Sequence, residues 1–126
     1  MSPIGTFLGK WVIGKQIPGG ILLHMEAMVT VAPHKKISGQ VTTSQALPEY
    51  HPIHIDVTGK YVDFELGGKK VHIATIENVD SKLPGAPSLK LLAVFDDAWQ
   101  SGTAWFHLVS GTLNLEENDA PVVVEK

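Results

Sequence analysis

Histidine and aspartate side chains offer a metal-binding pattern in this 126-residue sequence. His54 and Asp56 are two positions apart, and such residues lie on the same side of a strand. With His72 or His107 as a third ligand, the set imitates the two-histidine, one-carboxylate triad of non-haem iron enzymes. A His-x-Asp pair on the polar side of a strand is more often simply exposed to water. A small metal-dependent enzyme is therefore the second alternative for the function, and no cofactor is predicted.

Other catalytic patterns are missing from the sequence. It has no cysteine, no Gly-x-Ser-x-Gly, no dinucleotide-binding glycine motif and no phosphate loop. The adjacent carboxylates Asp96 and Asp97 are better explained as caps of a turn. The sequence therefore favours a protein that is not an enzyme.

Aromatic side chains provide a second kind of candidate site. Trp11, Tyr61, Trp99 and Trp105 lie on or near predicted strands, and aromatic residues at a barrel mouth can hold small apolar ligands. Ordinary core packing is the competing explanation, and we favour it for Trp11. Trp105 lies opposite the apolar side of its strand, so a pocket or an interface is equally plausible there. A carrier of a small apolar ligand is the first alternative for the function.

Charge narrows the range of partners. All ten basic residues are lysines, and the net charge is −3. Arginine dominates specific contacts to nucleic acids, so no nucleic-acid partner is expected. Charged residues make up 18% of the chain, against about 25% in typical soluble domains. So little charge on a small protein indicates that part of its exterior is covered by a second copy.

Short segments with alternating apolar and polar residues must position these side chains. A period of two is typical of half-buried strands, and it predicts an all-β protein. The predicted strands are Thr6–Ile13, Ile21–Val31, Lys36–Gln45, Ile53–Val57, Val62–Leu66, Lys70–Glu77, Leu89–Phe95, Thr103–Val109, Thr112–Leu115 and Val122–Val124.

Three connections have distinct signals. The apolar residues are odd-numbered in Ile53–Val57 and even-numbered in Val62–Leu66, so we predict a bulge or bend at Gly59. Two consecutive glycines after Leu66 predict a tight hairpin. Asp96–Ser101 is predicted as a single helical turn that Gly102 ends, and residues 46–52 and 78–87 as loops.

These segments predict one domain over residues 1–126, an antiparallel barrel of about eight strands. A two-sheet sandwich would produce the same alternation and is the alternative. No apolar run reaches the roughly 20 residues of a membrane-spanning helix. The first residues show no basic region followed by an apolar stretch, so a cytoplasmic location is expected.

The hairpin formed by residues 89–109 is the predicted interaction surface. Its second side carries Leu92, Val94, Trp105 and His107, which is more apolar than a solvent-facing side needs to be. We therefore expect a non-enzymatic binding or interaction module that self-associates through this hairpin.

One short motif resembles a known group of barrels. The segment Phe7-Leu8-Gly9-Lys10-Trp11 resembles the Gly-x-Trp of the first strand in lipocalins and related calycin barrels, including the avidins. The resemblance implies a ligand-carrying barrel with the tryptophan closing one end against a basic residue. The matching arginine is absent from this chain.

A broader resemblance spans most of the sequence. The elements that carry it are Ser38-Gly39, the run from Gln45 to Pro48, and above all Trp99–Ala104. Together they resemble a family of small bacterial proteins known only as a domain of unknown function. This resemblance implies a compact β protein from a bacterium, without an assigned reaction.

Overall fold

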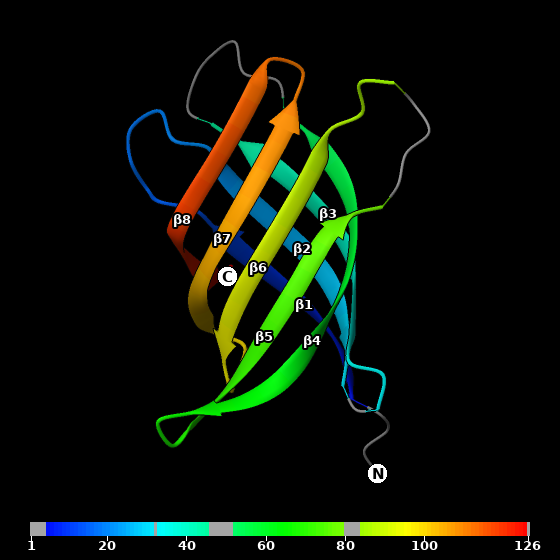
Figure 1. The fold of residues 1–126 in the computed structure, drawn as a ribbon, viewed down its shortest axis with the longest axis vertical. Helices are drawn as coiled ribbons and strands as arrows, with labels where there is room; N and C mark the ends of the chain where they lie inside the picture. The colour runs from blue at the N-terminus through cyan, green and yellow to red at the C-terminus, as the bar shows by residue number, and fades with distance from the viewer. Residues whose placement is uncertain (1–4, 32, 46–51, 80–83, 126) are drawn as a thin grey trace.

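The strands of this protein close into one antiparallel barrel (Figure 1). The computed structural model describes residues 5–31, 33–45, 52–79 and 84–125. Each strand pairs with its neighbours in sequence, and the first pairs with the last. The strands are β1 (Thr6–Ile13), β2 (Leu22–Thr30), β3 (Lys36–Ser44), β4 (His54–Leu66), β5 (Lys69–Asn78), β6 (Ser88–Asp96), β7 (Ser101–Ser110) and β8 (Leu113–Val124). The predicted all-β barrel is confirmed, and the sandwich is not formed.

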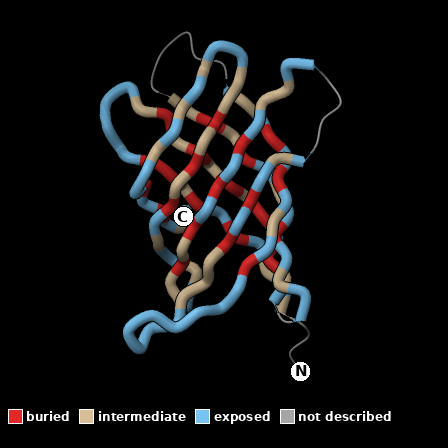
Figure 2. Tube along the Cα trace, viewed as in Figure 1, coloured by how far each residue is buried: buried red, intermediate tan, exposed pale blue. Residues whose placement is uncertain are grey.

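The inner wall of the barrel follows the predicted alternation. In β2, Leu23, Met25, Ala27 and Val29 are buried, while the residues between them are more exposed. The same banding runs around the barrel as alternating buried and exposed segments (Figure 2). Burial of these apolar side chains, at roughly 25 cal/mol per Å², is the main force that closes the sheet.

A bulge or a bend was predicted at Gly59, and the bulge is wrong. The pairing of β4 with β5 runs without interruption from Val57, opposite Asn78, to Leu66, opposite Lys69. A Cβ atom at Gly59 would overlap the backbone of β5, so this glycine permits a close approach of the two strands. Because no residue is inserted, the inward side of β4 keeps its odd numbers through Tyr61. The even-numbered apolar residues that follow therefore point outward.

A bulge that the sequence reading missed lies in β8. The register between β7 and β8 shifts between Ala104 and Phe106, and Asp119 takes a positive φ of 54°. The extra residue restores the inward direction of Ala120 and Val122, which are buried. The two predicted strands at the C-terminal end are consequently one strand.

The connection between β6 and β7 is a tight turn and not the predicted helical turn. The Trp99 N–H donates to the Asp96 carbonyl oxygen at 3.0 Å, and the Gln100 N–H donates to Asp96 Oδ1 at 2.8 Å. Trp99 has a φ of 61°, which turns its side chain back over the end of the barrel. Gly102 lies within β7 and ends no helix.

The double-glycine hairpin between β4 and β5 is confirmed. Gly67 and Gly68 have φ values of 57° and 82°, which suit a tight turn between twisted strands. Of the predicted loop at residues 46–52, all but Pro52 lies outside the described residues, as do residues 80–83 of the second loop.

Candidate functional site

The barrel interior, where a carrier would hold its ligand, is packed with side chains. Trp11, Phe95 and Phe106 are each at most 1% exposed. A void large enough for a water molecule would leave accessible area on the side chains around it. The middle of the barrel therefore has the close packing of an ordinary core.

An aromatic cluster closes the end of the barrel where the β4–β5 hairpin and the β6–β7 turn meet. The Trp11 indole N–H donates to the Trp99 carbonyl oxygen at 2.8 Å. The ring centroids of Phe95 and Tyr61 each lie 4.8 Å from that of Trp99. Trp11, Tyr61 and Trp99 thus belong to one packed aromatic cluster, which agrees with the core packing favoured for Trp11.

His72 joins this cluster and links it to charged groups. Its ring stacks on Trp99 with centroids 4.2 Å apart and planes 9° apart. Its Nδ1 lies 2.7 Å from Asp63 Oδ1, and its Nε2 lies 3.0 Å from the Asp97 carbonyl oxygen. Both partners are acceptors when Asp63 is ionised, so only a doubly protonated ring donates both hydrogen bonds.

Two pKa values respond to this arrangement. Burial raises the Asp63 pKa, but the hydrogen bonds and positive charges of His72 and Lys35 outweigh burial and bring the pKa below its ordinary value. Burial, and then the charge of Asp63, raises the pKa of the Tyr61 hydroxyl. This end of the barrel therefore contains an ionised Asp63 carboxylate and a neutral Tyr61 hydroxyl.

The residues of the proposed metal triad lie apart. His54 and Asp56 are exposed on the outer side of β4, where His54 Nδ1 is 3.1 Å from Thr42 Oγ1. His72 belongs to the aromatic cluster, and His107 Nε2 is 2.6 Å from Asn114 Oδ1 on β8. Within the described residues, no three histidine or acidic side chains come together as a metal site.

The outer surface of β4, β5 and β6 carries an apolar face, which the sequence reading found only in part. Val62, Phe64 and Leu66 are 57%, 51% and 52% exposed. The apolar face consists of Val62, Phe64, Leu66, Val71, Ile73, Leu92 and Val94. Leu92 and Val94 were predicted; the other members follow from the uninterrupted register of β4.

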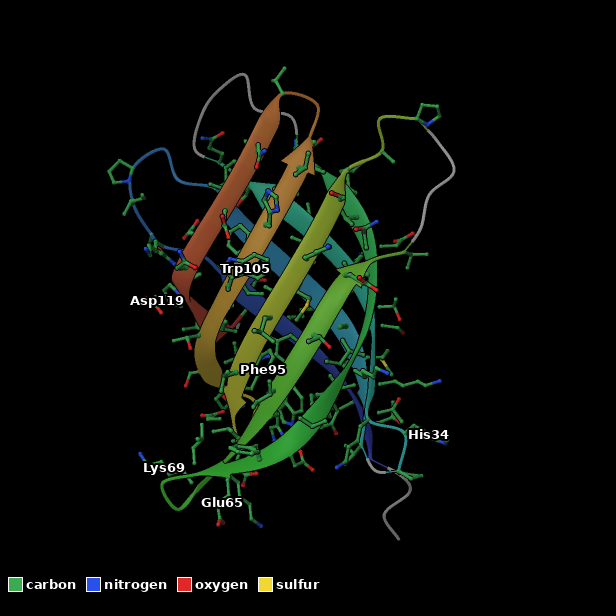
Figure 3. The ribbon with its side chains drawn as sticks, viewed as in Figure 1. His34, Glu65, Lys69, Phe95, Trp105 and Asp119 are labelled. Atoms are coloured by element: carbon green, nitrogen blue, oxygen red, sulfur yellow. The ribbon has the colours of Figure 1, made fainter. Side chains whose placement is uncertain are left out.

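Strand pairing makes these side chains contiguous. Val62 pairs with Ile73 on β5, and Ile73 pairs with Val94 on β6. Phe64 pairs with Val71 in the next row. The tip of the β4–β5 hairpin extends past the end of β6, and Glu65 and Lys69 mark it (Figure 3). Contiguous exposed apolar surface of this kind is typical of interaction sites.

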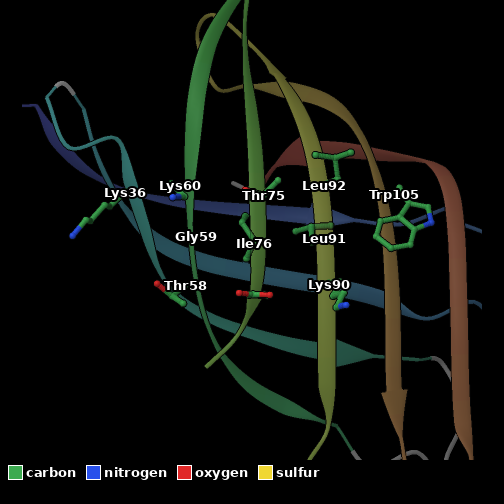
Figure 4. A pocket seen from close by; sticks show the side chains of 11 residues that line it. Lys36, Thr58, Gly59, Lys60, Thr75, Ile76, Lys90, Leu91, Leu92 and Trp105 are labelled. Carbon is green, nitrogen blue, oxygen red and sulfur yellow. The ribbon is translucent and has the colours of Figure 1, made fainter. Parts of the chain in front are cut away.

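A groove lies beside the apolar face, on the outer side of β3 to β7 (Figure 4). Its volume is about 640 Å³. It is lined by Lys36, Thr58, Gly59, Lys60, Thr75, Ile76, Glu77, Lys90, Leu91, Leu92 and Trp105. No signal in the sequence marks this groove, because it depends on which residues of five strands lie opposite one another.

Trp105 and His107 are half-buried on this outer side, and each has a polar partner on β8. The Trp105 indole N–H donates to Glu116 Oε2 at 2.7 Å. Trp105 therefore lines the groove, whereas His107 is satisfied by Asn114 and contributes to neither the groove nor the apolar face.

The fold and its surface define a class of protein: a small barrel with a packed interior, whose apolar face and groove lie on its outer wall. Within that class, the chain belongs to a family described as "Domain of unknown function (DUF1842)", whose model matches residues 4–112. The expected membership of a family of unknown function is thereby confirmed. No curated protein matches the chain.

None of the described residues forms a helix with the length and apolarity that crossing a bilayer requires.

Proposed function

We propose that this protein is a non-enzymatic interaction module that self-associates through its apolar face. The main support is the outward direction of Val62, Phe64 and Leu66, each more than half exposed on a strand whose inner side is already packed. Apolar residues on the outer side of a barrel strand add nothing to its core. Their burial against another surface would stabilise that contact.

A side-chain face is the surface that a closed barrel offers for such a contact. Every strand of the described residues has a pairing partner on each side, although β1 and β8 pair through only three residues of each strand. Strand addition is therefore limited to short unpaired edges, and we assign the association to side chains that project from the outer wall.

A second copy of this chain is the partner that fits best. The central row of the apolar face, Val62, Ile73 and Val94, carries no charge. A two-fold contact sets such a row against its own copy and matches apolar surface to apolar surface. It also buries no like charges against each other. The low charge of the whole chain, 18% of its residues, agrees with a covered surface.

Light scattering over a wide range of protein concentrations tests the proposal. The native chain should show a mass that rises with concentration. In the double variant Phe64→Thr and Ile73→Thr, the dissociation constant should rise by about 10-fold to 100-fold, because two apolar anchors are removed from the contact. Threonine is chosen because it keeps the β propensity of the strands.

A matched control lies on the opposite wall. Leu8 and Met28 are also exposed, and they are paired in register between β1 and β2. The variant Leu8→Thr and Met28→Thr removes similar apolar surface and should associate like the native chain. A native chain that stays monomeric at all concentrations, or equal loss of association in both variants, would contradict the proposal.

The first alternative, a carrier of an apolar ligand, has less support, because the barrel interior is packed. The cytoplasmic location and the bacterial origin stay predictions.

A further inference from the structure

We propose that the groove on the outer side of β3 to β7 is a binding site for a small amphiphile with an anionic head group. The groove measures about 640 Å³, which lies within the usual range of small-molecule sites. The proposal does not depend on self-association, because the groove adjoins the apolar face and shares only Leu92 with it.

The floor of the groove is largely apolar. Thr75, Leu92 and Trp105 lie directly opposite one another on β5, β6 and β7. The hydrogen bond from the Trp105 indole N–H to Glu116 fixes the ring. Its polar edge is thereby satisfied, and its apolar surface is left to contact a ligand at little cost in side-chain entropy.

The rim of the groove is positively charged. Lys36 and Lys60 lie directly opposite each other on β3 and β4, an arrangement of like charges that destabilises a sheet. Lys90 adds a third ammonium group, and Glu77 is the one acidic residue of the lining. Among the described residues, none of the three lysines has an ion-pair partner within 4.0 Å.

Charge complementarity therefore selects the head group of the ligand. The chain as a whole has a net charge of −3, yet the lining of this groove has an excess of positive charge. A carboxylate, sulfate or phosphate head group near Lys36 and Lys60 would relieve their repulsion. An alkyl or aromatic body would extend over Leu92 and Trp105. A cationic amphiphile with the same body would meet repulsion at the rim.

Matched probes test this inference. Octanoate, octylammonium and 1-octanol have the same alkyl chain and differ in head-group charge. Each is titrated, below its micelle-forming concentration, into isotopically labelled protein and followed by NMR. Octanoate should shift the signals of Thr75, Leu92 and the Trp105 indole in a saturable way. Octylammonium should bind at least about 10-fold more weakly, as expected for the loss of three modest charge contacts.

Two triple variants with the same net charge separate the groove from the overall charge of the protein. Lys36→Gln, Lys60→Gln and Lys90→Gln should weaken octanoate binding by about 10-fold. Lys15→Gln, Lys69→Gln and Lys70→Gln remove three exposed lysines away from the groove and should leave the affinity within about twofold, because distant charges are screened by salt.

A third comparison distinguishes the source of the anionic group. Vesicles of phosphatidylglycerol present the same kind of charge on a membrane surface. Binding to vesicles without binding to octanoate would overturn the proposal of a small-molecule site. Equal affinity for octanoate and octylammonium, or equal loss in both triple variants, would overturn it as well. All titrations are repeated on the Phe64→Thr, Ile73→Thr chain, in which association should be weakened and the groove retained.

Discussion

Gly9 and Trp11 act as a pair on the inner side of β1. A Cβ atom at Gly9 would overlap the six-membered ring of Trp11, so the glycine leaves room for the indole to lie over the strand. Trp11 is 1% exposed and donates its N–H to Trp99. The Gly-x-Trp motif therefore has a direct steric explanation in this chain.

This pairing makes a testable prediction. Gly9→Ala should lower the free energy of unfolding by about 1–3 kcal/mol, because the added methyl group overpacks the core. The penalty should be clearly smaller in a Trp11→Leu chain, where the ring is gone. Urea unfolding of the four chains measures the difference. An equal penalty in both backgrounds would show that the indole is not what excludes the methyl group.

Asp63 gives a second prediction at this scale, through pH. Its pKa lies below the ordinary value of 3.8 because His72 and Lys35 outweigh burial. A carboxyl group of this kind contributes stability that is complete above its unfolded pKa and is lost as the pH falls through the lower folded value. Asp63→Asn should therefore be less stable than the native chain at neutral pH, and the difference should shrink below pH 3.8.

The size of this effect is limited by solvent. The Asp63 side chain is 51% exposed, so screening keeps its contribution small. Glu65→Gln is the matched control, since Glu65 lies on the same strand and has no ion pair among the described residues. Unfolding by urea at neutral and acidic pH should show a pH-dependent difference for the Asp63 variant alone.

The β4–β5 hairpin is the element on which the apolar face depends. Its turn uses positive φ values at Gly67 and Gly68. Gly68→Ala should destabilise the protein by about 1–2 kcal/mol, because a Cβ atom is disfavoured in the left-handed region. Gly67→Asn should cost less, since asparagine tolerates this region. Thermal unfolding of the two variants checks the order, and the reverse order would contradict the proposed turn geometry.

Strand alternation predicted most elements correctly, because each inner side has to be apolar. β1 was predicted to the residue, and β2, β3 and β6 to within one residue at either end. The prediction failed at β4, where the apolar residues change side after Tyr61. If all apolar residues of this strand faced the core, a bulge would be required there. The actual strand continues without one and places Val62 and Phe64 on the outer side of the barrel. A pattern of this kind does not distinguish an irregular core strand from a strand with an exposed apolar side.

Part of the candidate site could be predicted from the sequence for a related reason. Leu92, Val94 and Trp105 stood out because both sides of their strands are apolar. The groove itself depends on one row of the sheet, in which Lys60 pairs with Lys36 on one side and with Thr75 on the other, and Thr75 pairs with Leu92. Register is set by the whole sheet, so no local pattern reveals it. The bulge at Asp119 was missed because polar residues separate Leu115 from Ala120, so the change from odd-numbered to even-numbered apolar residues resembled a gap between two strands.

The barrel as a whole is closed by a short seam. β1 and β8 pair through three residues on each strand, and Val122 lies opposite Ile13. Val122 is 1% exposed and its neighbour Val123 is 45% exposed. Val122→Ala should cost about 2 kcal/mol through lost burial and a cavity, while Val123→Ala should change stability by less than about 0.5 kcal/mol.

Unfolding in urea distinguishes these outcomes, and the adjacent position serves as the control. Equal effects of the two substitutions would mean that the seam is not packed on its inner side, which would contradict the closed barrel.

The order of the strands also has a consequence for how the chain folds. In the described part of the chain, seven strand pairs join segments that are consecutive in sequence, whereas β1 must meet β8 across most of the chain. The entropy lost in closing a loop rises with its length, and contacts between distant segments slow folding. The final joining of the two terminal strands therefore carries the largest ordering cost of any pairing in this molecule.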